Sequence, residues 1–100
     1  MPYSPQFALL VPEDQAAEPF GITPDNPEQG FSLAECYAHI GCEAIDIVRF
    51  TPPLPGSPEW IAIIDDNGRI NGRGFNLGAS FMCNVELFGT VILCPSGWLK

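Results

Sequence analysis

The chain has 100 residues, which is enough for one domain with a modest hydrophobic core and too few for a second. Apolar residues make up 46% of it and charged residues 16%, a composition that excludes an intrinsically disordered chain. The formal net charge is −8, and no basic residue precedes Arg49. Because an acidic surface repels phosphates and anionic lipid, we expect no direct nucleic-acid binding and no membrane association, while the scarcity of charge leaves room for a homo-oligomer.

The first expected strand covers residues 6–11, where a short apolar run is ended by Pro12, whose nitrogen has no hydrogen to donate. Residues 12–30 follow as a connection rich in proline, glycine and acidic residues. The apolar run is too short for the hydrophobic part of a signal peptide and has no basic residue before it, so we expect a cytoplasmic protein.

Ser32 and Glu35 have the spacing of a capping box, in which each side chain accepts a hydrogen bond from the backbone N–H of the other residue. This pattern predicts a helix that begins at Leu33. The helix should end at Gly41, because glycine readily adopts the left-handed conformation found just beyond helix ends.

Residues 44–50 alternate between two faces and predict a strand, which the proline-rich loop 51–58 connects to a second strand at residues 60–64. Asn67 and Gly68 follow that strand. Asn-Gly is the preferred pair for a two-residue type I′ turn, in which both residues have positive φ. The sequence therefore predicts a β-hairpin that turns at these two residues, with its second strand in the segment that follows.

Asn76 is a suitable N-cap for a short helix over residues 77–83. Residues 85–93 predict a last strand with a bulge at Gly89. This order of elements favours the α+β class. We expect residues 1–100 to form a single small domain, with a mainly antiparallel sheet and one or two short helices on one face.

Residues 31–95 carry four short motifs in a fixed order: a helix ending in Gly-Cys before a strand with an acidic residue, an Asp-Asp-Asn-Gly turn, an Asn-Leu-Gly-Ala helix start and a closing Gly-Thr-Val-Ile strand. Their segments are Ile40–Val48, Ile63–Gly68, Asn76–Ser80 and Phe88–Leu93. The series resembles a family of small bacterial, plasmid and phage proteins of unknown function. Family members often have Leu-Pro before the matching Asn, where this chain has Arg73-Gly74-Phe75. The resemblance implies an accessory protein of mobile elements and no particular activity.

Arg69 and Arg73 lie close to Gly72 and Gly74, just before the expected helix start at Asn76. Glycines let backbone N–H groups approach a ligand, and guanidinium groups bind phosphates and carboxylates in a forked geometry. These five residues form the predicted ligand-binding site, for a small anion or for a carboxylate of a partner. The alternative without a ligand is a loop whose arginines only balance the negative charge of the first half of the chain.

Cys36, His39 and Cys42 are spaced three residues apart and would share a helix face if the helix continued. Gly41 is expected to end it first, and structural zinc needs four ligands, usually in two close pairs. We therefore expect no metal and no cofactor. All four cysteines lie in or beside apolar runs, which favours reduced, buried thiols.

These features favour a non-enzymatic accessory or interaction protein of the mobile-element type, which binds a protein partner or a small anionic ligand. One alternative is a small hydrolase or transferase in which His39 activates Cys36 as a nucleophile. Another is a protein that sequesters nucleotides through Arg69 and Arg73. The favoured hypothesis, a non-enzymatic protein, includes no catalytic residue.

Overall fold

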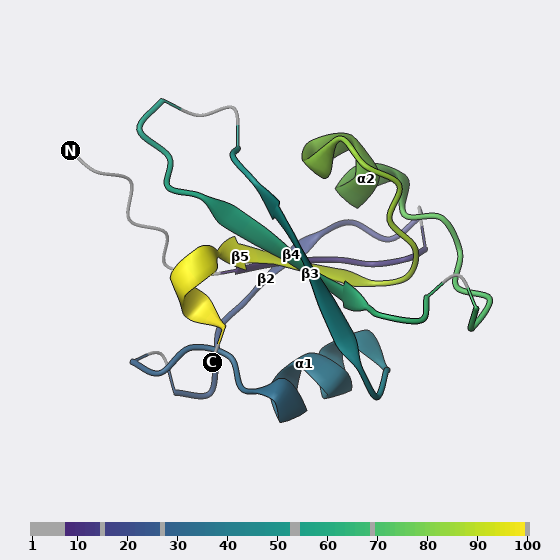
Figure 1. The fold of residues 1–100 in the computed structure, drawn as a ribbon, viewed down its shortest axis with the longest axis horizontal. Helices are drawn as coiled ribbons and strands as arrows, with labels where there is room; N and C mark the ends of the chain where they lie inside the picture. The colour runs from purple at the N-terminus through teal and green to yellow at the C-terminus, as the bar shows by residue number, and fades with distance from the viewer. Residues whose placement is uncertain (1–7, 15, 27, 53–54, 69, 100) are drawn as a thin grey trace.

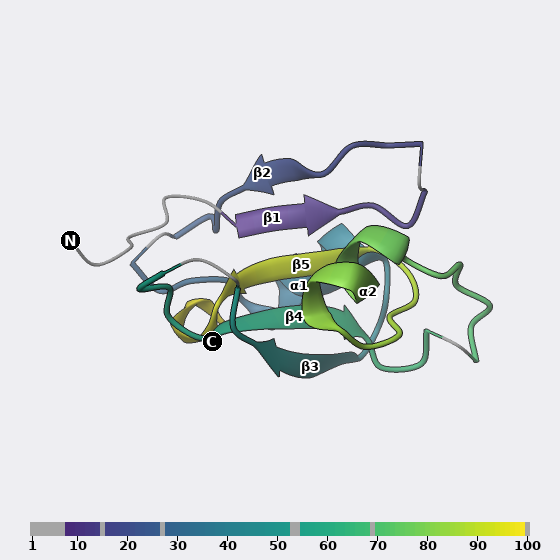
Figure 2. The same cartoon turned by 90° about the horizontal axis from the view of Figure 1, so that it is seen from above.

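The computed structural model describes residues 8–14, 16–26, 28–52, 55–68 and 70–99. One five-stranded antiparallel sheet forms the centre of the molecule (Figure 1, Figure 2). Its strands are β1 (Ala8–Val11), β2 (Phe20–Ile22), β3 (Ile45–Phe50), β4 (Trp60–Asp65) and β5 (Val91–Pro95), in the spatial order β2-β1-β5-β4-β3. The predicted α+β class, with a mainly antiparallel sheet in one small domain, is confirmed.

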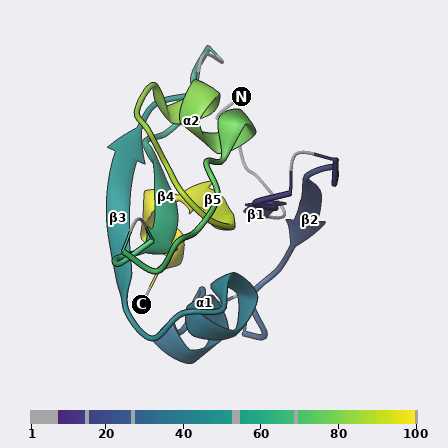
Figure 3. The same ribbon diagram turned by 90° about the vertical axis from the view of Figure 1, so that its right-hand side faces the viewer.

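The two helices, α1 (Leu33–Ile40) and α2 (Leu77–Cys83), cover opposite faces of this sheet, as Figure 3 shows. The sequence predicts both helices on one face of the sheet, and this prediction is wrong. Ile63 of β4 packs in the core cluster that contains α1 residues, and its neighbour Ala62 packs in the cluster that contains α2 residues. Successive side chains of a strand point to opposite faces, so the uninterrupted apolar runs of β4 and β5 require cover on both sides.

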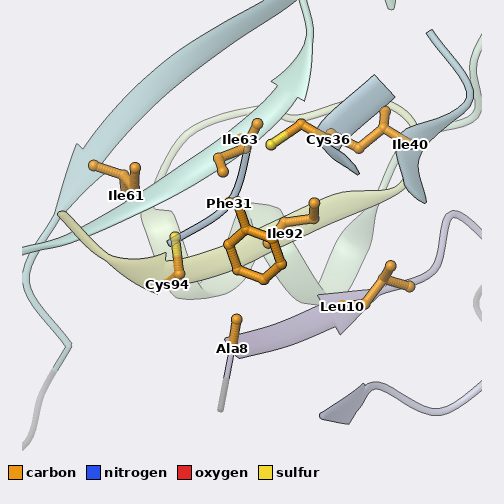
Figure 4. Close-up of a cluster of buried hydrophobic side chains, with 9 residues drawn as sticks. All are labelled: Ala8, Leu10, Phe31, Cys36, Ile40, Ile61, Ile63, Ile92 and Cys94. Carbon is orange, nitrogen blue, oxygen red and sulfur yellow. The ribbon is translucent and has the colours of Figure 1, made fainter. Parts of the chain in front are cut away.

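The core on the α1 side is shown in Figure 4. Its buried residues are Ala8, Leu10, Phe31, Cys36, Ile40, Ile61, Ile63, Ile92 and Cys94. Phe31 is fully buried, and its backbone N–H donates to the carbonyl oxygen of Trp98 in the 3₁₀ turn η1 (Ser96–Trp98), which follows β5. This bond holds the C-terminal turn against the segment that leads into α1.

Both helices begin where their caps predict. Glu35 N–H donates to Ser32 Oγ at 3.2 Å, and Ser32 N–H donates to Glu35 Oε1 at 3.1 Å, which completes the capping box of α1. Gly41 ends α1 with φ at 78°. The side chain of Asn76 caps α2 by accepting from Ala79 N–H at 3.1 Å. These local predictions are confirmed.

The predicted hairpin at Asn67 and Gly68 is wrong. Neither residue has positive φ, and β4 pairs with β3 before it and with β5 after it. Asp65 makes the turn instead: its Oδ1 accepts from Asn67 N–H at 2.9 Å, and its carbonyl accepts from Gly68 N–H at 3.1 Å. A Cβ at position 68 would lie 3.2 Å from the carbonyl oxygen of Phe88, so Gly68 avoids a tight contact there. The polar residues that follow cannot compete with two apolar strands for the edges of β4.

Two further differences from the prediction concern the strands: one strand is not predicted by the sequence, and one begins later than predicted. Within the connection 12–30, residues 20–22 form β2, an edge strand that pairs with β1; its three residues fit between Pro19 and Pro24 because an edge strand tolerates flanking prolines. The last strand begins at Val91 and not at residue 85, because Gly89 turns the chain with φ at 87°. Residues 6 and 7 of the predicted first strand lie outside the described residues.

Candidate functional site

Arg73, one of the five predicted ligand-binding residues, lies beside the end of β4. Its Nε donates to Asp65 Oδ2 at 3.2 Å, and its Nη2 donates to the carbonyl oxygen of Gly41 at the end of α1. Arg73 therefore connects three segments: the end of α1, the end of β4 and the loop before α2. Arg69 lies outside the described residues.

Asp65 is the partner that holds Arg73. Its side chain is almost fully buried and also accepts from Asn71 Nδ2 at 3.2 Å. Burial by itself raises the pKa of Asp65, but the hydrogen bonds from Asn67, Asn71 and Arg73 outweigh it and hold the pKa below its ordinary value. The carboxylate is thus ionised at neutral pH and satisfied from within the chain.

A polar pocket of about 350 Å³ surrounds this pair. Its lining residues are Gly41, Cys42, Glu43, Ala44, Asp65, Asn67, Asn71 and Arg73. Among the described lining residues there are two carboxylates and one guanidinium, and that guanidinium already pairs with Asp65. An anion that binds the guanidinium of Arg73 would therefore compete with the Asp65 carboxylate for it. The ligand-binding role of these residues stays a prediction.

The other three predicted site residues, Asn76, Gly74 and Gly72, have different surroundings. Asn76 is buried, and its Nδ2 donates to the carbonyl oxygens of Val11 at 3.0 Å and Gly89 at 2.8 Å. Its amide is thus committed to the fold. Gly74 faces the side chain of Glu13, since a Cβ at Gly74 would lie 3.3 Å from Glu13 Cγ. Gly72 is exposed and has φ at 73°.

The Arg73–Asp65 pair predicts a pH-dependent stability. Replacing Arg73 by methionine should lower the free energy of unfolding by about 1–3 kcal/mol at neutral pH, because it leaves a buried carboxylate unpaired. The folded-state pKa of Asp65 is depressed, so the pair stabilises the fold above the unfolded-state pKa of about 3.9 and its contribution disappears as pH falls through the lower folded-state value.

Denaturant titrations from about pH 7 to about pH 3 measure this effect. The loss caused by Arg73→Met should shrink below about pH 4. Arg49→Met is the matched control, because Arg49 pairs with Glu59 at 2.9 Å on the exposed surface and should contribute less than about 0.5 kcal/mol. A loss from Arg73→Met that is the same at all pH values would contradict the assignment.

The geometry gives no support to the cysteine nucleophile. Cys36 is fully buried, and desolvation, with a smaller effect of the Glu35 charge, raises its pKa to about 11. A nucleophilic cysteine needs an accessible, low-pKa thiolate. His39 is exposed and lies edge-on to the Phe31 ring, with 6.3 Å between the ring centroids. Within the described ranges, no three His, Cys, Asp or Glu side chains are grouped as metal ligands.

A surface that the sequence analysis missed lies on the outward face of α2. It consists of five exposed large apolar side chains, Phe75, Leu77, Phe81, Met82 and Val85, and is called the α2 surface below. Phe81 is 86% exposed and Leu77 is 56% exposed. The side of the helix that packs on the sheet carries the small residues Ala79 and Ser80, both buried. The helix thus buries Ala79 and Ser80 and exposes its large apolar residues.

The sequence did contain a signal for this surface. Leu77, Phe81 and Val85 recur every four residues, so they lie on one side of a helix and its continuation, while Gly78, Ala79 and Ser80 are small. The usual inference is that the large residues face the core. Here the side of α2 that packs on the sheet carries Ala79 and Ser80 instead, which only the packing of the helix reveals.

Two hollows flank Phe81 on the α2 surface. The first, of about 480 Å³, lies between α2 and the connection after β1; the second, of about 350 Å³, lies between α2 and the segment that follows it. Leu77 and Phe81 line both hollows. Asp14 lines the first, and Glu86 lines the second. The site is therefore an apolar ridge with a hollow and a carboxylate on either side.

Comparison with protein-family models, curated proteins and solved structures finds no match for this chain. None of the helices in the described part of the chain is both long and apolar enough to cross a bilayer. Function is therefore inferred from the geometry of the chain itself.

Proposed function

We propose that the protein is a non-enzymatic accessory protein that acts by binding a protein partner through the α2 surface. The exposure of Phe81 carries this proposal. Contiguous apolar side chains on the surface of a soluble domain commonly mark an interaction site. Covering Phe81 and Leu77 would contribute about 1.5–3 kcal/mol each, which is a substantial fraction of the free energy of a micromolar complex.

Other features agree with this role. The resemblance of residues 31–95 to small bacterial, plasmid and phage proteins supports an accessory protein of the mobile-element type. The four cysteines are free thiols, which supports a reducing compartment such as the cytoplasm. The net charge of −8 supports a partner other than nucleic acid. The small anionic ligand is the less favoured alternative, because the guanidinium of Arg73 already pairs with the Asp65 carboxylate.

A photo-crosslinking experiment in cells of the source organism tests the proposal. Phe81 is replaced by the photoreactive residue p-benzoylphenylalanine, and a parallel chain carries the same residue at Leu33. Leu33 is the matched control, because it is the first residue of α1, is 47% exposed and lies on the other side of the sheet. A discrete adduct is expected from position 81 and not from position 33.

The adduct is identified by mass spectrometry, and its partner is then purified and titrated against the protein. Leu77→Ser should weaken that binding by about tenfold or more, because the variant removes a buried apolar contact. Leu33→Ser should leave the affinity unchanged. Identical adducts from the two positions, or binding that is equally sensitive to both serine variants, would contradict the proposal.

A further inference from the structure

We infer that the free edge of β3 is a docking site for an extended segment of a protein partner, which adds an antiparallel strand to the sheet and carries a lysine or arginine opposite Asp46. This inference goes beyond the proposed function, because it concerns the edge of the sheet and not the α2 surface. It follows from the direction of the backbone groups of β3 and from the charge of Asp46.

The two edges of the sheet differ in their capacity to accept another strand. β2 forms one edge with three residues that lie between Pro19 and Pro24, and a short strand flanked by prolines is a poor template for pairing. β3 forms the other edge with six residues, contains no proline, and pairs with β4 without interruption. Figure 2 shows β3 on the outer side of β4. A strand can therefore be added at β3.

The backbone groups of every second β3 residue point away from β4. Asp66 N–H donates to the carbonyl oxygen of Ala44 at 3.0 Å, and this pair continues the register of the two strands. Hydrogen-bonded and non-hydrogen-bonded positions alternate along an antiparallel pair, so even-numbered β3 residues bond to β4 and odd-numbered ones face the free edge. Ser96 N–H donates to the carbonyl oxygen of Glu59, which agrees, because it leaves the even-numbered residues of β4 for β3. The outward-facing residues are Ile45, Ile47 and Arg49.

Asp46 lies beside the central donor of this edge. Its Oδ1 accepts from Ile47 N–H at 2.8 Å, a local bond on the exposed surface. Among the described residues, no cationic side chain pairs with the Asp46 carboxylate. An added strand takes over Ile47 N–H and places one side chain directly opposite Asp46, at a non-hydrogen-bonded position, where side chains approach most closely. A lysine or arginine at that position pairs with the released carboxylate.

A second copy of β3 does not supply this charge. Two copies that pair through their outward-facing residues place an even-numbered residue opposite Asp46. In β3 that residue is Val48, Phe50 or another Asp46. Arg49 lies on the other face of the sheet and already pairs with Glu59 at 2.9 Å. The occupant is therefore a different chain.

Binding of designed β-hairpin peptides to the full chain tests the inference. Three cyclic hairpins have an outer strand Val-Thr-Val-X-Val, in which X is lysine, glutamine or glutamate and lies opposite Asp46. NMR titration measures their affinity, and hydrogen exchange measures the protection of single amides. The lysine hairpin should bind about two- to fivefold more tightly than the glutamine hairpin, and the glutamate hairpin should bind most weakly, because opposite charges attract across a strand pair. Binding should slow exchange at the amides of Ile45, Ile47 and Arg49.

Matched changes separate the charge from the backbone pairing. Asp46→Asn keeps an oxygen that accepts from Ile47 N–H but removes the charge, so it should abolish the preference for lysine. Asp25→Asn changes the net charge equally at an exposed position after β2, the opposite edge strand, and should leave the preference unchanged. A lysine hairpin N-methylated at its central valine cannot donate to the carbonyl oxygen of Ile47 and should bind about tenfold more weakly. This last change leaves the protein itself unaltered.

Each contrary result has a separate meaning. If no hairpin binds, or if N-methylation leaves the affinity unchanged, the edge of β3 is not the docking site. If the lysine and glutamine hairpins bind equally, the basic character of the partner is wrong. Binding that Leu77→Ser weakens would place the hairpin on the α2 surface instead. A dimer in sedimentation that protects the same three amides without peptide would identify a second copy as the occupant. In all these cases the crosslinking experiment still decides whether the α2 surface binds a protein.

Discussion

Replacing Asn76 by alanine is expected to lower the free energy of unfolding by about 3–7 kcal/mol, a large fraction of the stability of a domain of this size. The amide of Asn76 donates to the carbonyl oxygens of Val11 and Gly89, and all three groups are buried. Each orphaned carbonyl costs about 1–3 kcal/mol, and loss of the cap that accepts from Ala79 N–H costs about 1 kcal/mol more.

Urea denaturation of the variants measures this loss. Asn76→Ser should recover part of it, because a serine hydroxyl can cap α2 but cannot reach both carbonyl oxygens. Asn71→Ala is the matched control: Asn71 is exposed, and among the described residues its side chain donates one hydrogen bond, to the Asp65 carboxylate, so its removal should cost less, about 1–2 kcal/mol. A loss of under about 1 kcal/mol for Asn76→Ala would refute the role assigned to its amide.

The same bonds connect stability to the proposed docking site. Asn76 ties the start of α2 to the backbone of Val11, and both residues line the first hollow beside Phe81. A variant that loosens this tie should therefore also change the shape of that hollow. Binding of a protein partner to the α2 surface should be weakened by Asn76→Ser even at temperatures where the variant remains folded.

Replacing Gly30 by alanine is the second change with a large expected effect, a loss of more than about 3 kcal/mol. Gly30 has φ at 79°, and a Cβ there would lie 2.1 Å from the carbonyl oxygen of Trp98. The left-handed conformation alone costs an alanine about 1–2 kcal/mol. The overlap adds more, because relieving it must shift η1 and with it the bond from Phe31 N–H to Trp98.

Gly56 provides the matched control. Its φ is 76°, and a Cβ there would meet no atom of the described residues within 4 Å. Gly56→Ala should therefore report the backbone strain without the overlap, about 1–2 kcal/mol. Thermal and urea unfolding of the two variants separate the cost of the backbone strain from the cost of the overlap with Trp98. Equal losses for Gly30→Ala and Gly56→Ala would mean that the contact with Trp98 does not constrain the chain in solution.

The sequence by itself determined the features that depend on neighbouring residues. The capping box of Ser32 and Glu35, the end of α1 at Gly41 and the cap of α2 at Asn76 are all formed within a few residues, so the pattern is sufficient to predict them. The α+β class also follows, since it depends on the order of the elements more than on their contacts.

Tertiary structure alone decided the features that depend on competition between distant segments. Asn67 and Gly68 have the local preference for a hairpin, but β3 and β5 occupy both edges of β4, so no strand can pair there. The partners of Arg73 within the chain, Asp65 and Gly41, also come from distant segments, and the sequence pattern does not identify them. The α2 surface was decided in the same way: α2 packs on the sheet through Ala79 and Ser80, and this orientation leaves Leu77 and Phe81 exposed.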